Sequence, residues 1–228
     1  MCQAGAVTTK KKSPKADPFA ALRANQPKQA RSRETLARLL DAAEKLLAAG
    51  GVEAATVPAI AERAGVSVGI VYQRFADKDA LLRAVYFRYF ANLREQNQNN
   101  LAVVAAWKAP LATLARTVIL GMVEGYRRQR GILRALMTYA RNHADPEFRR
   151  AARELNREAS STIEQLLLAR RDEIRHPHPK VAIELGLLTI ASVLHTIVLE
   201  EEPLPSMRGQ AKLDEELVRM FCAYVGIG

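Results

Sequence analysis

Cysteine, glycine and proline are scarce in this sequence, and each shortage excludes a class of protein. The 228 residues include only two cysteines, Cys2 and Cys222, which stand at opposite ends and exclude a disulfide framework. Only 12 glycines and 10 prolines occur, which excludes low-complexity disorder through most of the chain. The cysteine usage indicates a reducing compartment, and we expect a cytoplasmic protein.

Residue spacings typical of strands, catalytic sites and metal sites are also missing. No run of alternating apolar and polar residues with hairpin turns occurs, so no strand is predicted. The four histidines, at positions 143, 176, 178 and 195, form no Glu-x-x-His pattern, and no Cys-x-x-Cys pair occurs. A glycine-rich phosphate loop and a nucleophile elbow are missing as well. We therefore expect neither an enzyme nor a bound metal or cofactor.

One apolar stretch, residues 181–199, has the length of a membrane-spanning helix. It contains Glu184 and His195. Both side chains are costly in lipid. A helix buried in an interface is therefore the better interpretation, and no membrane partner is expected.

Positive charge is abundant but unevenly distributed. The chain holds 34 Lys and Arg against 24 Asp and Glu, a net charge of +10. Residues 1–35 alone contribute +6, with eight basic and two acidic side chains, whereas residues 36–90 contribute only +1. Such an excess is typical of proteins with a polyanionic partner. Residues 1–30 show no apolar periodicity, so we interpret them as a flexible basic arm.

The apolar periodicity beyond the arm predicts an all-α protein. A leucine-rich stripe begins near Arg31 and ends at Gly50-Gly51. Proline, glycine and Asp-Pro breaks separate the later segments. The predicted helices after the first are 56–64, 67–75, 78–105, 110–129, 131–142, 146–174, 179–201 and 210–225. Residues 31–80 are expected to form a small three-helix domain, and 81–228 a larger helical domain.

The segment 56–75, TVPAIAERAGVSVGIVYQRF, has the spacing of a helix-turn-helix motif. Thr56 and Ser67 are suitable N-caps for its two helices. Ala61 is small where the helices must cross, and Gly65 can take the positive φ of the turn. The second helix then presents its polar side outward, which in such motifs enters the major groove of DNA.

With ETLARLLDAAEKLLAAGG before it and ADKDALL after it, this motif resembles the DNA-binding domain of the TetR family of transcriptional regulators. The resemblance covers about residues 33–82 and implies a homodimer whose C-terminal domain binds a small effector. It implies phosphate contacts at Thr56, Val57 and Lys78. It also places Ser67, Val68 and Gly69 at the start of the recognition helix, Tyr72 against a phosphate, and Gln73 as the reader of a base.

We expect the helices of the larger domain to form a dimer interface and an effector pocket. Residues 179–201 are apolar almost all round, so pairing with 210–225 and a second copy would bury them in a four-helix interface. The predicted interface residues are Ala182, Gly186, Ile190, Val193, Leu217 and Phe221. The predicted lining of a pocket for a lipophilic or aromatic effector is Tyr86, Phe90, Trp107, Met122, Tyr126, Met137, Tyr139 and His195.

These features favour a homodimeric regulator that binds a palindromic operator in double-stranded DNA, most readily a repressor released by its effector. An activator of the same family is an alternative. A helical ligand-binding or interaction protein with nonspecific polyanion affinity is another, and a helical enzyme that uses an apolar cavity is a third.

Overall fold

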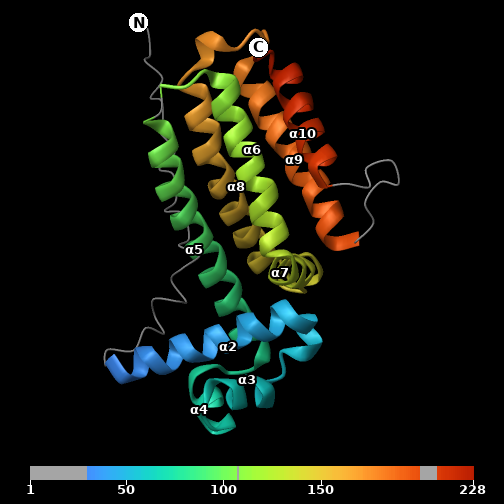
Figure 1. Cartoon of the computed structure of the whole chain (residues 1–228). Coiled ribbons are helices and arrows are strands. Elements are labelled where there is room, and N and C mark those ends of the chain that lie inside the picture. Colours follow the sequence, from blue (N-terminus) through green and yellow to red (C-terminus); the bar gives the residue numbers. More distant parts are fainter. Residues whose placement is uncertain (1–29, 107, 201–209) are drawn as a thin grey trace, which may run out of the picture.

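The computed structural model describes residues 30–106, 108–200 and 210–228, and throughout these ranges the elements are helices joined by short connections. Figure 1 shows two parts, a small unit below and an upright helical bundle above it. The all-α fold predicted from the sequence is confirmed. The predicted basic arm and Trp107 lie outside the described residues.

The small unit consists of α2 (Ala30–Ala54), α3 (Val57–Ala64) and α4 (Val68–Arg74). The regular part of α2 ends at the predicted glycine pair, because Gly50 and Gly51 leave helical geometry and Gly51 has a φ of 67°. The last turn of α2 then leads to α3 and α4, which lie beneath it (Figure 1). The order of the two short helices and their breaks agree with the sequence prediction.

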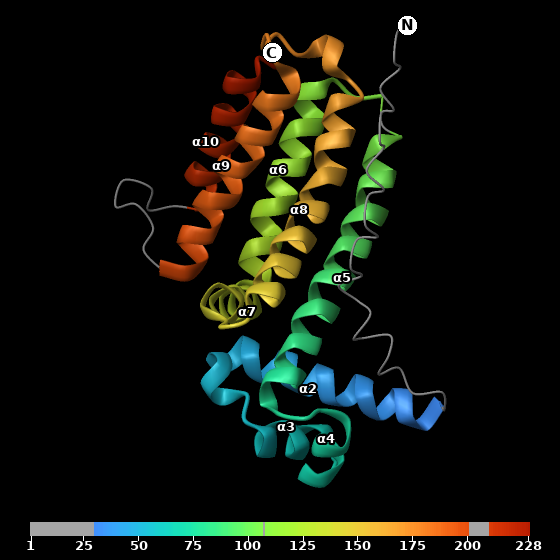
Figure 2. The same cartoon turned by 180° about the vertical axis from the view of Figure 1, so that it is seen from behind.

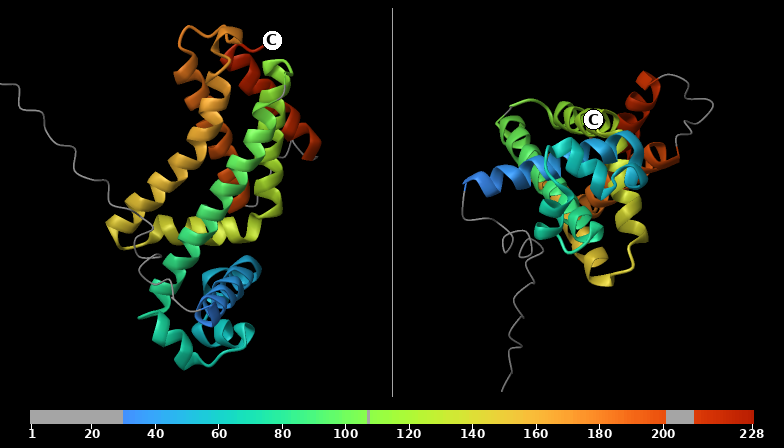
Figure 3. Two further views of the ribbon diagram at one scale, coloured as in Figure 1. Left: turned by 90° about the vertical axis from the view of Figure 1, so that its left-hand side faces the viewer. Right: turned by 90° about the horizontal axis from the view of Figure 1, so that it is seen from below.

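The upright part is a bundle with one helix lying across its lower end. Figures 1 and 2 show α7 between this bundle and α2, and Figure 3 shows from below that α2 crosses under the bundle. The elements in chain order are α5 (Lys78–Ala105), α6 (Leu111–Arg128), α7 (Arg130–Asn142), α8 (Pro146–Leu168), the 3-10 turn η1 (Arg171–Glu173), α9 (Pro179–Glu200) and α10 (Gln210–Val225).

One predicted helix, 146–174, is shorter than expected. Helix α8 ends at Leu168, and η1 follows it. Glu173 in η1 accepts a hydrogen bond from the backbone N–H of Leu111 at 3.1 Å, so it satisfies a free donor in the first turn of α6. The segment after α8 therefore caps the N-terminus of α6 instead of continuing the helix. This contact is tertiary, so the apolar periodicity of the sequence could not predict it.

Two apolar clusters stabilise the chain. The first joins α2, α3 and α4 to the lower part of α5, to α7 and to the start of α8. The second joins α6, the C-terminal half of α8, α9 and α10. Tyr126 on α6 packs against both clusters and marks their boundary. The small unit is thus continuous with the lower bundle through a shared core.

Candidate DNA-binding surface and its supporting structure

Local hydrogen bonds build the α3–turn–α4 motif as the sequence predicts. The Thr56 hydroxyl accepts the N–H of Ala59 at 3.3 Å, and the Ser67 hydroxyl accepts the N–H of Ile70 at 3.4 Å. Gly65 has a φ of 66° and ψ of 41°, the left-handed geometry that a tight turn after a helix requires. These contacts confirm both caps and the role of the glycine.

Helix α4 is buried on one side only. Val71 is 1% exposed and anchors the helix to the first cluster, whereas Tyr72 is 55% and Val68 38% exposed. Ser67, Gly69 and Gln73 are exposed too, so the structure brings the five predicted recognition residues together on one outward surface. An exposed tyrosine and valine on a short helix leave apolar surface in water, which is typical of a contact surface.

The side chains of Val57 and Lys78, both predicted to contact phosphates, are engaged within the protein. The side chain of Val57 is only 5% exposed and packs in the core, so its backbone N–H in the first turn of α3 is the group left for a phosphate. The ammonium of Lys78 donates a hydrogen bond to the carbonyl of Val52 at 2.9 Å. Lys78 therefore ties the start of α5 to the end of α2, and this bond must open before the ammonium can neutralise a phosphate.

A polar cluster, missed by the sequence prediction, joins the first turn of α5 to α7 and α8. The Asp79 carboxylate accepts hydrogen bonds from the Tyr139 hydroxyl at 2.6 Å, from Nε of Arg83 at 2.7 Å and from Nε2 of His143 at 2.9 Å. Arg83 also pairs with Asp145, the N-cap of α8, at 2.6 Å. We call these five residues the Asp79 cluster; it connects the segment after the recognition helix to the bundle.

Burial tends to raise the pKa of Asp79, but hydrogen bonds from Tyr139, Arg83 and His143 outweigh it and lower the pKa to about 2. Nδ1 of His143 accepts the backbone N–H of Asp145 at 3.1 Å, so Nε2 carries the proton donated to Asp79. The cluster thus holds an ionised aspartate in a fixed orientation. Its members come from distant parts of the sequence, which is why no local pattern indicated them.

The structure places most of the residues predicted for the dimer interface inside the chain's own core. Ala182, Ile190 and Phe221 have no exposed surface, and Leu217 and Gly186 are buried as well. A Cβ on Gly186 would lie 2.8 Å from the Phe221 ring, so this small residue admits α10 of the same chain. Val193, the sixth predicted residue, is half-buried. The apolar side chains that point outward from α9 and α10, here called the outer face, are Val181, Leu185, Leu188, Met220 and Tyr224.

Comparison with known proteins agrees with this architecture. Residues 39–85 match the family described as bacterial regulatory proteins, tetR family, and residues 110–224 match the tetracyclin repressor-like C-terminal domain. The chain belongs to the TetR family. It is 34% identical over 89 residues to the uncharacterized HTH-type transcriptional regulator TtgW of Pseudomonas putida, covering 39% of this chain and 66% of TtgW. It is 39% identical over 67 residues to the HTH-type transcriptional repressor KstR of Rhodococcus jostii, covering 29% of this chain and 32% of KstR.

A solved structure shares the fold of this TetR-family chain over most of its length. FadR from Bacillus subtilis, determined in complex with stearoyl-CoA, superposes with a TM-score of 0.62 at 18% identity. The match covers 83% of this chain and 98% of that one. The chain spans at most 66% of the length of the curated relatives that it matches.

The predicted effector-pocket residues fall into separate places in this TetR-family structure. Tyr86 and Phe90 stack in the first cluster with ring centroids 4.6 Å apart, and Tyr86 is 1% exposed. Met137 packs there too, while Tyr139 belongs to the Asp79 cluster. Tyr126 and His195 form a second pair, with ring centroids 5.6 Å apart, and Met122 packs in the same second cluster as Tyr126.

Two further observations concern partners other than DNA. Among the described residues, no three His, Cys, Asp or Glu side chains gather as metal ligands would. Pro179–Ile197 is by length and composition apolar enough to cross a membrane. That alone is weak evidence for a span, because core helices share these properties, and here Ile183, Leu187 and Leu194 pack in the second cluster.

Proposed function

We propose that this TetR-family protein is a sequence-specific DNA-binding transcriptional regulator, acting in the cytoplasm as a repressor. The observation that carries the proposal is the outward surface of α4, where Ser67, Val68, Gly69, Tyr72 and Gln73 lie together on a helix held by two caps. We propose the division into a DNA-binding domain at 31–80 and an effector and dimerisation domain at 81–228.

Each exposed group suits a particular part of a DNA duplex. Gln73 can pair through its amide with adenine, and Val68 can contact a thymine methyl group. Gly69 lets the backbone approach the duplex closely, and the Tyr72 hydroxyl can donate to a phosphate. Thr56 is exposed at the N-terminus of α3, where free backbone N–H groups favour an anion. The contacts are thus divided between base reading and backbone positioning.

A second copy of the chain is the proposed partner of the outer face. Leu188 is 62% and Val181 55% exposed, which is costly for a monomer in water. An isologous contact of this face with itself would form a four-helix interface of two α9 and two α10 helices. A dimer also presents two recognition helices to a palindromic operator, provided that they stand about 34–36 Å apart.

The proposed effector is a small lipophilic or aromatic molecule. Burial raises the pKa of Tyr126 to about 12, and burial together with the charge of Arg141 lowers the pKa of His195. Both side chains are therefore neutral at pH 7, and a neutral aromatic lining favours an uncharged or apolar ligand group. Effector binding would release the DNA if the effector has a higher affinity for a conformation of the dimer in which the spacing of the recognition helices does not match the operator.

Selection of bound duplexes from a random DNA pool is the experiment that tests this function. We expect a palindromic consensus, and we expect Tyr72→Phe to bind it more weakly while the dimer persists. Binding that depends on salt but shows no sequence preference would instead indicate a protein with nonspecific polyanion affinity. Transcription from a promoter that carries the consensus then distinguishes a repressor from an activator.

A further inference from the structure

The recognition helix α4 is joined to α2 by a directional contact between side chains. Nη2 of Arg74, the last residue of α4, donates a hydrogen bond to the Ser32 hydroxyl at 2.6 Å, across 42 positions of sequence. In the described part of the chain, no other side-chain hydrogen bond joins α4 to a different helix. Both side chains are partly buried, and a hydrogen bond from a charged donor is stronger than one between neutral groups. The first turn of α2 is therefore fixed to the end of α4.

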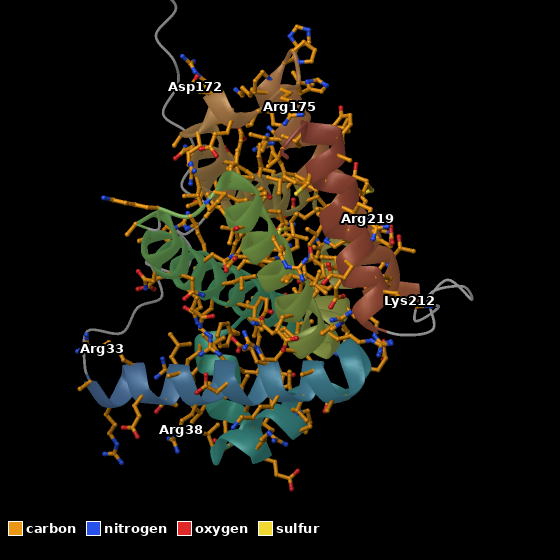
Figure 4. The ribbon with its side chains drawn as sticks, turned by 45° about the horizontal axis from the view of Figure 1, so that its top comes forward. Arg33, Arg38, Asp172, Arg175, Lys212 and Arg219 are labelled. Carbon is orange, nitrogen blue, oxygen red and sulfur yellow. The ribbon has the colours of Figure 1, made fainter. Side chains whose placement is uncertain are left out.

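The other end of α4 lies near α2 as well. Nη1 of Arg38 is 3.8 Å from the position that a Cβ on Gly65 would take, so the guanidinium lies at the turn before α4. Figure 4 shows Arg38 on the side of α2 that is directed towards α3 and α4. Six positions separate Ser32 from Arg38, about 9 Å along the helix axis, and the seven residues of α4 extend over about 10.5 Å. The first turns of α2 therefore span α4 from one end to the other, in the opposite direction.

A helix as short as α4 depends on its neighbours for its position, because two turns are not stable alone in water. Its apolar anchors are the buried side chains of Val71 and of Phe75, which directly follows the helix. Apolar burial is non-directional, so it sets how deeply α4 lies but selects its rotation less strictly. A hydrogen bond requires a nearly linear arrangement of donor, hydrogen and acceptor. The bond between Arg74 and Ser32 therefore fixes the rotation of α4 about its own axis.

The proposed base contact needs a fixed rotation of this kind. Gln73 is exposed and stands directly before Arg74, so it projects from the same last turn of α4. Its amide pairs with adenine through two hydrogen bonds at once, which requires the donor and the acceptor to meet the base edge together. A rotation of α4 would break one of these two bonds, and a single remaining bond is less selective among bases.

The partner of Arg74 is neutral, so the positive charge at the end of α4 is kept. In the part of the chain that the structure describes, no acidic side chain forms an ion pair with Arg74. A carboxylate at position 32 would also hold the guanidinium, but it would bring a negative charge beside a surface proposed to meet phosphates. A hydroxyl at this position orients Arg74 without that repulsion.

We propose that Ser32 and Arg74 are positioning residues for base recognition. Their hydrogen bond fixes the rotation of α4 and thereby holds the Gln73 amide in the orientation that reads its base pair. This inference rests on the proposed function, since a base pair is read only within an operator. Loss of the hydrogen bond then lowers the discrimination between bases and leaves the number of phosphate contacts unchanged.

Ser32→Ala in the full chain tests the proposal, because it removes the acceptor and keeps every charge. At the base pair where Gln73→Ala loses discrimination, Ser32→Ala should lower the preference for the selected base by about five- to tenfold. The log–log salt slope on the consensus should stay unchanged, since no phosphate contact is lost. Ser32→Thr keeps a hydroxyl and should retain the preference. Ser160→Ala is the matched control, because this exposed serine on α8 donates to the Asn156 carbonyl of its own helix, and it should change neither quantity.

A double-mutant cycle separates positioning from a general structural role. If Ser32 acts through Gln73, the Gln73→Ala chain has no oriented amide to lose, so adding Ser32→Ala should not reduce its preference further. Losses that multiply in the double variant would overturn the proposal, and so would an unchanged preference in Ser32→Ala or a full preference in Gln73→Ala. A uniform loss of affinity on all sequences with a changed salt slope would also overturn it, because Ser32 would then act on phosphate contacts. The proposed function fails separately, if the unmodified chain selects no consensus.

Discussion

Replacing Asp79 with asparagine removes the negative charge at the centre of the Asp79 cluster while keeping its shape. Asparagine can still accept from Tyr139 or His143, but its amide nitrogen cannot accept the N–H of Arg83, which now lies 2.7 Å from a carboxylate oxygen. A hydrogen bond to a charged group contributes about 1.5–3 kcal/mol when well buried. The Arg83 and Asp79 side chains are 34% and 42% exposed, so solvent screening reduces this contribution.

The expected loss is about 2 kcal/mol at pH 7, from the lost Arg83 bond and the weakened bonds of Tyr139 and His143. For a chain of this size, that corresponds to a decrease in Tm of about 4–8 °C. Urea unfolding followed by circular dichroism measures it. Asp172→Asn is the matched control, because Asp172 is 98% exposed at the far end of the bundle, labelled in Figure 4, and a surface substitution changes stability by about 0.5 kcal/mol or less.

The pH dependence follows from the direction of the pKa shift. The pKa of Asp79 falls from 3.8 to about 2 in the folded chain, because hydrogen bonds to the carboxylate outweigh the effect of burial. A depressed pKa stabilises the folded state above about pH 4, and this stabilisation is lost as the pH falls towards 2. The difference between wild type and Asp79→Asn should therefore narrow over this range. A difference that is independent of pH, or no larger than that of Asp172→Asn, would refute the role of the charged cluster.

Three other substitutions test the packing, the dimer and base reading. Gly131→Ala should destabilise the chain by about 1–3 kcal/mol, because its Cβ would lie 2.1 Å from the Ala48 carbonyl oxygen. The control Gly125→Ala meets nothing within 4 Å and should be neutral or stabilising in the same urea assay. Equal effects of the two substitutions would contradict the close approach of α7 to α2. Leu188→Glu should halve the mass measured by light scattering, and a persistent dimer would exclude the outer face as the interface. Gln73→Ala should lose about 1–3 kcal/mol of discrimination at one base pair with an unchanged salt slope, and a uniform loss on all sequences would argue for a phosphate contact instead.

Local signals predicted the helix-turn-helix closely. Thr56, Ser67 and Asp77 accept the N–H groups of residues three positions later, and Gly65 takes the left-handed turn. Each of these interactions is completed within a few residues, so the amino-acid sequence is sufficient to identify it. The exposed side of α4 follows too, because a short amphipathic helix has one apolar side to bury.

The tertiary structure decided the features that depend on distant neighbours. Helix α9 is apolar on nearly every side, so its periodicity could not show which residues contact α10 of the same chain and which point outward. The six residues predicted for the dimer interface lie on the buried or half-buried sides of α9 and α10. Likewise, Lys78 donates a hydrogen bond to the Val52 carbonyl of α2, and Tyr139 donates one to Asp79. The sequence pattern could not show these bonds, because the partners lie far apart along the chain.

Sequence alone thus determined the all-α fold, the family resemblance and the composition of the recognition surface, because capping, turn geometry and amphipathic periodicity are short-range properties. The Asp79 cluster, the outer face and the attachment of Ser32 to Arg74 were decided only when the helices packed. These features depend on side chains far apart in the sequence, 42 positions for Ser32 and Arg74 and 60 for Tyr139 and Asp79. Such contacts are set by how whole helices bury their apolar surfaces against one another.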